Sequence, residues 1–272
     1  MSWTTQPVES LDDPRLTPYT RLTEVDLRRQ WELEHGLFIA EGHLVIERAA
    51  RSGLRVESVL TAPRWLERLV DILGDWSGDV LVADEDLLEQ IAGFHVHRGA
   101  LAAVRRPPSI PVAALLEEEG PILVLEELVD ATNVGLAIRS AIGLGIDAVV
   151  LSPGCADPLY RRAVKSSMGA VLQARWARSE SWIDDLRSIA AVRELVVLTP
   201  AGEQLIDEVL AHVNPEQVAL RMGSEGPGAS PAALRATARH ARIPMHSGVD
   251  SLNVAAATAV ACFALDQARR TS

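Results

Sequence analysis

The sequence predicts an α/β protein in which two sheets are covered by helices. Short apolar segments alternate with segments of helical periodicity along most of the 272 residues, and this alternation is typical of βαβ units. Apolar strands without polar interruptions indicate a parallel sheet that is buried on both faces. Residues 105–111 contain three prolines, which favour an extended spacer, so the sequence predicts two domains.

The first domain is expected over residues 1–106 and is followed by a linker over residues 107–116. Segments of helical periodicity predict helices at residues 22–33, 42–50, 63–73 and 84–91. The apolar runs between them predict strands at residues 37–40, 56–60, 80–82 and 100–104. Asp84 precedes the last of these helices, where its side chain can accept a hydrogen bond from the first turn.

The second domain is expected over residues 117–272 and repeats the alternation. Its predicted helices cover residues 133–144, 158–165, 182–190, 231–238 and 254–269. Fully apolar runs predict strands at residues 122–125, 148–151, 195–198 and 218–222, and a further short strand stops at Pro244. Asn133 is expected to cap the helix that it opens.

The composition indicates a folded protein of a reducing compartment. Hydrophobic residues make up 48% and charged residues 23% of the chain, which allows a sizeable core and excludes disorder as the dominant state. The 2 cysteines form no CxxC motif, as expected of a cytosolic protein. The first residues lack the pattern of a signal peptide, and residues 254–265 are too few to span a bilayer. We therefore expect a cytoplasmic location.

The net charge at first argues against a nucleic-acid partner. The chain has 26 basic and 37 acidic residues, a formal charge of −11, and no basic tail. Net charge governs solubility, however, whereas a local cluster of basic side chains is what binds phosphate groups. Lys165 is the only lysine, so such a cluster would consist mainly of arginine, whose planar guanidinium binds phosphate bidentately.

Three glycine-containing segments lie where a predicted strand meets a predicted helix. The first contains Asn133 and Arg139, and an arginine among apolar residues is unfavourable unless it meets an anion or a carboxylate. On its own, this segment also fits a capped core helix with one solvated arginine. Its glycines are not spaced as in the GxGxxG motif of dinucleotide-binding proteins.

The second segment holds Gly223, Glu225, Gly226 and Gly228 directly after an apolar strand. Glycines let backbone amides approach a ligand closely. The segment lacks the GKS/T of a P-loop, so a nucleoside triphosphate is not expected. A flexible turn before the next helix is the alternative interpretation.

The third segment, residues 243–254, runs from a short strand into a helix whose start holds Ser251 and Asn253. Both residues are suited to helix capping, so an ordinary capped helix is the alternative. The carboxyl ends of parallel strands meet at one edge of a sheet, where ligands bind. We therefore expect the three segments to form one ligand site.

These segments resemble the three motifs of the SpoU (TrmH-like) RNA 2′-O-ribose methyltransferases, in the SPOUT superfamily, in order and in spacing. The resemblance extends over residues 120–270 and rests on Asn133, Gly135, Arg139, Ala141, Gly145, Gly223, Glu225, Gly228, Ile243, Pro244, Met245, Ser251, Leu252, Asn253 and Val254. Ala131 stands where the family often has proline, and we expect activity to be kept. Residues 38–42 and 93–99 are similar to the L30e-like RNA-binding domain that is often fused to these enzymes.

The resemblance implies a C-terminal SPOUT domain with a parallel sheet and a trefoil knot, preceded by an L30e-like α/β domain. It implies S-adenosylmethionine as cofactor, structured RNA as substrate and a homodimer. The implied cofactor contacts are Gly223, Gly228, Ile243, Met245 and Leu252. The implied catalytic residues are Asn133, Arg139, Glu225, Ser251 and Asn253. A guanidinium stays protonated, so Arg139 is expected to bind a phosphate and stabilise a developing alkoxide rather than act as a base.

Basic residues of both domains are candidates for contacts with RNA. The candidate RNA-binding residues are Glu41 and the basic residues Arg21, Arg28, Arg98, Arg161, Arg162 and Lys165. A solvated helix face explains the last three equally well. No metal site is expected, because the alternating His95 and His97 fit packing or an RNA contact better than metal ligation.

The sequence therefore predicts an S-adenosylmethionine-dependent methyltransferase acting on a ribose 2′-hydroxyl, with ribosomal RNA as the first candidate substrate and transfer RNA as the second. Two other classes are weighed against it. A non-catalytic RNA-binding or ribosome-assembly protein on the same fold is disfavoured by the presence of Asn133, Arg139 and Glu225. A nucleotide-binding α/β enzyme acting on a small molecule fits the net charge but leaves the three motifs unexplained.

Overall fold

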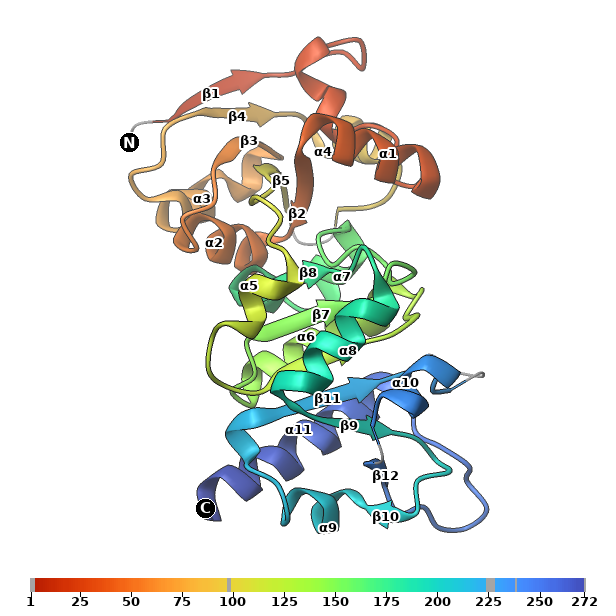
Figure 1. The fold of residues 1–272 in the computed structure, drawn as a ribbon. Coiled ribbons are helices and arrows are strands. Elements are labelled where there is room, and N and C mark those ends of the chain that lie inside the picture. The colour runs from red at the N-terminus through yellow and green to blue at the C-terminus, as the bar shows by residue number, and fades with distance from the viewer. Residues whose placement is uncertain (1–2, 97–98, 224–227, 238, 272) are drawn as a thin grey trace. The chain divides into compact units, whose positions relative to one another are not determined.

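The chain folds into two compact units, which Figure 1 shows as a ribbon. A computed structural model describes residues 3–96, 99–223, 228–237 and 239–271. The first unit comprises Met1–Pro107 with Leu159–Leu172, and the second unit comprises Pro108–Pro158 with Gln173–Ser272. Each unit has its own sheet and its own hydrophobic core.

A five-stranded mixed sheet forms the first unit. Its strands follow the order β1 (Thr4–Pro7), β4 (Asp79–Val82), β3 (Val56–Thr61), β5 (Ala100–Arg105) and β2 (Leu37–Glu41). β5 is antiparallel to both of its neighbours, and the other pairs are parallel. The sequence does not predict β1, because this edge strand is mostly exposed and lacks an apolar run.

Helices of the first unit pack around this sheet. They are η1 (Pro14–Tyr19), α1 (Val25–His35), α2 (His43–Arg51), η2 (Pro63–Trp65), α3 (Leu66–Leu73), α4 (Glu85–Ala92) and α7 (Arg161–Ser166), with η3 (Ala170–Gln173) at the boundary of the unit. Asp84 Oδ1 accepts the amide hydrogen of Leu87 at 2.7 Å, which confirms the predicted cap of α4. The core includes the fully buried Tyr19 and Ile39.

Seven parallel strands form the sheet of the second unit. Their order is β10 (Gln204–Leu205), β12 (His240–Arg242), β9 (Glu194–Leu198), β11 (Val218–Met222), β6 (Ile122–Leu125), β7 (Ala148–Leu151) and β8 (Arg175–Arg178). Each neighbouring pair is parallel. Every residue of β6, β7 and β11 is buried, which confirms the prediction of a buried parallel sheet.

The helices of the second unit are α5 (Val112–Leu116), α6 (Ala131–Gly143), α8 (Trp182–Val192), α9 (Ile206–Leu210), η4 (Pro215–Gln217), α10 (Pro231–Ala236) and α11 (Val254–Thr271). Most of them lie between two strands along the chain, whereas α5 precedes the first strand and α11 follows the last. The long α11 packs against α6 and α9. No helix within the described residues is long and apolar enough to cross a membrane.

The structure adds β8, β10 and α9, which the sequence does not predict, and α7 starts at Arg161 rather than at residue 158. Other predicted boundaries also differ. α6 begins at Ala131, and its cap is Asp130, whose Oδ1 accepts the amide hydrogen of Asn133 at 2.9 Å. The prediction that Asn133 caps this helix is therefore wrong, because the helix starts earlier and Asn133 lies in its first turn. α5 forms inside the expected linker, where Val112 is buried against the core. β12 ends at Arg242, before the apolar residues that predict a strand.

The backbone of Gly202 closely approaches the edge of β12. A Cβ at this position would lie 2.5 Å from the carbonyl carbon of Ala241. We expect Gly202→Ala to lower the free energy of unfolding by about 1–3 kcal/mol, since the neighbouring backbone must shift. Gly143→Ala is the control: nothing lies within 4 Å of its Cβ, so stability should stay equal or rise slightly. Equal urea midpoints for the two variants would contradict the close approach.

Candidate functional site

A cavity of about 420 Å³ opens at the carboxyl ends of the parallel strands of the second unit. The segments after β11 and β12 contribute most of its wall. The sequence-predicted residues that line it are Gly223, Gly228, Ile243, Met245, Ser251 and Leu252. The structure therefore brings the second and third motifs together around one cavity.

A further wall of the cavity comes from a segment that the sequence interpretation did not include. Leu198 ends β9, and Thr199, Pro200 and Ala201 follow it along the cavity. The signal was present in the sequence, since a Pro–Ala–Gly turn follows an apolar strand as in the other segments. This segment resembles no motif, and only the parallel sheet brings it to the site.

Asn253 connects the first and third motifs. Its Oδ1 accepts the amide hydrogen of Ala255 at 3.0 Å, which confirms its predicted capping role at the start of α11. Its Nδ2 donates a hydrogen bond to Asn133 Oδ1 at 3.2 Å. Because Asp130 caps α6, the side chain of Asn133 is available for this contact. The start of α6 is thus tied to the start of α11 beside the cavity.

Arg139 lies on the exposed side of α6. Its neighbours Ala137, Ile138 and Ala141 are buried, so the helix has one apolar and one solvated face. Within the described part of the chain, no carboxylate pairs with Arg139. Its exposed guanidinium can receive an anion from outside the protein.

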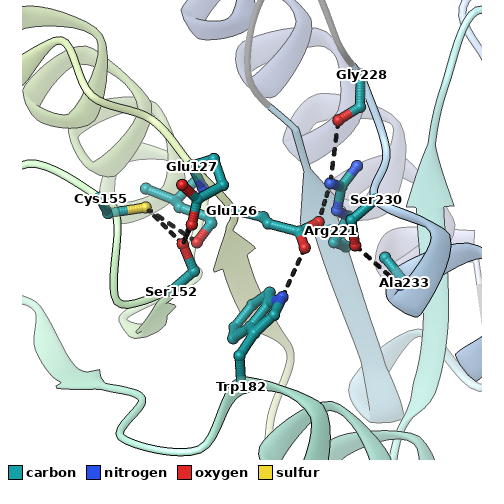
Figure 2. A network of polar contacts seen from close by, with 10 residues as sticks. Glu126, Glu127, Ser152, Cys155, Trp182, Arg221, Gly228, Ser230 and Ala233 are labelled. Carbon is teal, nitrogen blue, oxygen red and sulfur yellow. Dashed lines mark hydrogen bonds and ion pairs between the residues drawn. The ribbon is translucent and has the colours of Figure 1, made fainter.

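A buried network of charges lies next to the second motif, and Figure 2 shows it from close by. Arg221 belongs to β11, and its Nη2 binds Glu126 Oε2, directly after β6. Trp182 Nε1 donates to Glu126 Oε1 at 2.6 Å. Burial lowers the pKa of Arg221, and the carboxylate of Glu126 opposes this shift. The sequence-based prediction did not include this pair, although a charged residue, Arg221, within an otherwise apolar strand could have indicated it.

The loop after β6 carries a strained residue. Glu127 has a φ of 54°, a conformation that residues other than glycine rarely adopt. Its amide donates to Ser152 Oγ at 2.9 Å, and that hydroxyl donates to Glu127 Oε1 at 2.9 Å. A Cβ at Gly154 would overlap the Glu127 carboxylate. Burial raises the pKa of the neighbouring Cys155 thiol, so this cysteine is not a thiolate nucleophile at neutral pH.

In the first unit, several candidate RNA contacts have partners within the protein. Arg28 is buried and pairs with Glu32 at 2.8 Å. The buried Glu41 binds Arg161 Nη1 at 2.5 Å and also the amine of Lys165. The Arg161 guanidinium lies 4.3 Å from the centre of the Phe94 ring. These contacts can hold the unit together whether or not RNA is bound.

The other candidates of the first unit differ in exposure. Arg21 and Arg162 are exposed. His95 Nδ1 lies 2.9 Å from Glu89 Oε2. Arg98, like Glu225 of the second unit and His97, lies outside the described residues. The described residues contain no group of His, Cys, Asp and Glu side chains that could hold a metal ion.

The chain is similar to known proteins in sequence and in structure. Residues 120–263 match the SpoU rRNA Methylase family. An uncharacterized tRNA/rRNA methyltransferase of Mycobacterium bovis is 41% identical, over 93% of this chain and 88% of that protein. The 23S rRNA (guanosine(2553)-2′-O)-methyltransferase of Bacillus subtilis is 29% identical, over 69% of this chain and 79% of that protein. The crystal structure of an AdoMet-bound rRNA methyltransferase from Sinorhizobium meliloti has a TM-score of 0.80 at 25% identity, with 98% of both chains covered.

The parallel sheet and the cavity at its carboxyl edge define an α/β protein with a cavity suited to a small ligand. The chain belongs to the SpoU rRNA Methylase family. This confirms the family resemblance that the three motifs carry, and with it the predicted class of enzyme, an RNA methyltransferase.

Asn253 both caps α11 and donates a hydrogen bond to Asn133, and two variants distinguish these roles. We expect Asn253→Ala to lower the free energy of unfolding by about 1 kcal/mol, because α11 loses its cap. Asn253→Ser should keep nearly full stability, since serine caps as well as asparagine but is too short to reach Asn133. Thermal unfolding measures both variants. An alanine variant as stable as the serine variant would contradict the capping role.

Proposed function

We propose that the protein transfers a methyl group from S-adenosylmethionine to a ribose 2′-hydroxyl of ribosomal RNA. The observation that carries the proposal is the convergence of the second and third motifs around one cavity, in a chain of the SpoU family. The Bacillus subtilis relative is named for 2′-O-methylation of a guanosine in 23S rRNA. The Sinorhizobium meliloti structure is that of an rRNA methyltransferase with AdoMet bound.

The cavity fits this cofactor by size and by chemistry. Its volume of about 420 Å³ lies within the range of small-molecule sites. Ile243, Met245 and Leu252 supply apolar walls that suit an adenine ring, and Gly223 and Gly228 expose backbone groups. When bound, S-adenosylmethionine supplies an electrophilic methyl group. These residues of the chain hold it and shield it from water.

The polar residues of the first and third motifs act on the RNA. Arg139 binds the phosphate next to the target ribose. It also stabilises the negative charge that develops on the 2′-oxygen of that ribose. Asn133, held by Asn253, positions the ribose or Arg139. Asn253 braces the loops, the family resemblance assigns the same role to Glu225 of the second motif, and Ser251 lies at the cavity wall. Correct positioning of two reactants can supply a large part of the rate enhancement.

We propose the same domain roles that the sequence suggests: an L30e-like RNA-binding domain over residues 1–106, a linker over residues 107–116 and the methyltransferase domain over residues 117–272. We also propose the trefoil knot of the family. The order of the sheet, with β11 between β6 and β9 and β12 beyond β9, is compatible with it.

A homodimer in the cytoplasm is the proposed state of the enzyme. Large apolar side chains that are exposed on a single chain support association. Val260 and Phe263 on α11 are 40% and 54% exposed, and Val129 before α6 is 77% exposed.

Transfer RNA is the alternative substrate, and methylation assays on separated ribosomal and transfer RNA distinguish the two.

Arg139→Ala is the direct test of the proposed catalytic residue. We expect methyl transfer to fall by at least about 100-fold, because a charged donor to the reacting oxygen is lost. The affinity for S-adenosylmethionine, measured by calorimetry, should stay within about two-fold, since Arg139 does not line the cavity. Arg139→Lys is the control and should retain part of the activity. Full turnover by the alanine variant would refute the role.

Arg161 and Arg162 are adjacent but differ in burial, which allows a matched test of RNA binding. Arg162→Ala should weaken RNA binding and make the slope of log affinity against log salt shallower by about 1, as for one lost phosphate contact. Arg161→Ala should instead lower thermal stability, because the buried Glu41 loses a partner. An unchanged salt slope in the Arg162 variant would exclude this residue from the RNA interface.

A further inference from the structure

Stability alone does not explain the buried ion pair between Arg221 and Glu126. The two side chains are 1% and 2% exposed. The removal of two charges from water is about as unfavourable as their mutual attraction is favourable. Buried pairs of this kind can often be replaced by apolar side chains without loss of stability. A role other than stabilising the fold must therefore explain why this ion pair lies in the centre of the sheet.

The hydrogen bonding of Arg221 is also incomplete. Nη2 donates to Glu126 and, at 3.4 Å, to the carbonyl oxygen of Gly228. Nε and Nη1 are buried and find no acceptor among the residues that the structure describes. With respect to the described residues, these donors are therefore unsatisfied, and a buried donor without an acceptor lowers stability.

The position of the Arg221 guanidinium suggests its role in the protein. Gly223 follows Arg221 by two residues, and a Cβ at Gly223 would overlap Nη1. Gly228, at the other end of the second motif, accepts from Nη2, as Figure 2 shows. Both glycines line the cavity. One side chain therefore contacts the two ends of the motif and sets their separation.

We propose that Arg221, held by Glu126 and Trp182, is a positioning residue that fixes Gly223 and Gly228 in the arrangement that binds the cofactor. The inference rests on the proposed function, because it takes the cavity to be the S-adenosylmethionine site. Trp182 matters because its Nε1 donates to Glu126 Oε1 and so fixes the carboxylate that orients Arg221. Arg221 acts through the backbone of the motif and does not touch the reacting atoms.

The test is a double variant that removes both charges and keeps the other contacts. In Glu126→Gln with Arg221→Met, the glutamine can still accept from Trp182, and methionine fills the space of the arginine stem. We expect an unchanged or higher thermal midpoint, a dissociation constant for S-adenosylmethionine raised about ten-fold, and an unchanged KM for RNA. The kcat at saturating cofactor should stay within about three-fold.

Two further variants complete the test. Arg221→Lys keeps a charge for Glu126 but replaces the planar guanidinium, whose Nη2 donates to Gly228 and whose Nη1 lies against Gly223, with a single amine, so cofactor affinity should fall by a smaller factor. Arg193→Met is the matched control: Arg193 donates to the backbone carbonyl of Gly120 at 3.3 Å, at the amino-terminal side of β6. It should lower the thermal midpoint without changing cofactor affinity.

Each result bears on the proposal. A stable double variant with wild-type cofactor affinity would overturn it. A double variant that fails to fold would also overturn it, because the pair would then serve stability. A loss of affinity in the control variant equal to that in the double variant would show a general effect of stability, and would count against positioning. If the wild-type protein itself does not bind S-adenosylmethionine, the proposed function fails instead.

Discussion

The parallel direction of all seven strands in the second unit is the constraint on which the site depends. Parallel strands place their carboxyl ends at the same edge, so the segments that follow β9, β11 and β12 meet although they are far apart in the sequence. The cavity is lined by these segments and by the first turns of α11. The site is therefore a property of the sheet, and the motif residues supply its chemistry.

Two hydrogen-bonded connections complete the arrangement. One joins the starts of α6 and α11 through Asn133 and Asn253. The other joins the end of β6 to the second motif through Glu126 and Arg221. The first starts in the first turn of α6 and the second directly after β6, and the strained Glu127 lies in the loop between these two points. Strained backbone is common at functional sites, and here it coincides with the place where the motifs are tied together.

The sequence predicts much of this fold, because the signals are local. Buried strands such as Ile122–Leu125 appear as apolar runs, and the cap at Asp84 follows from its side chain. The edge strand β1 has no apolar run, and the cap of α6 is predicted at Asn133, whereas the structure uses Asp130. The site residues of the second and third motifs were predicted by resemblance. The β9 segment and Arg221 were missed, because their roles depend on strand order.

We propose that the motif segments after β11 and β12 form the site of the methyl donor. A crystal structure of the protein with S-adenosylmethionine would locate the cofactor. We expect it to lie in the cavity against Gly223, Met245 and Leu252. A cofactor bound outside this cavity, with those residues free of contact, would contradict it.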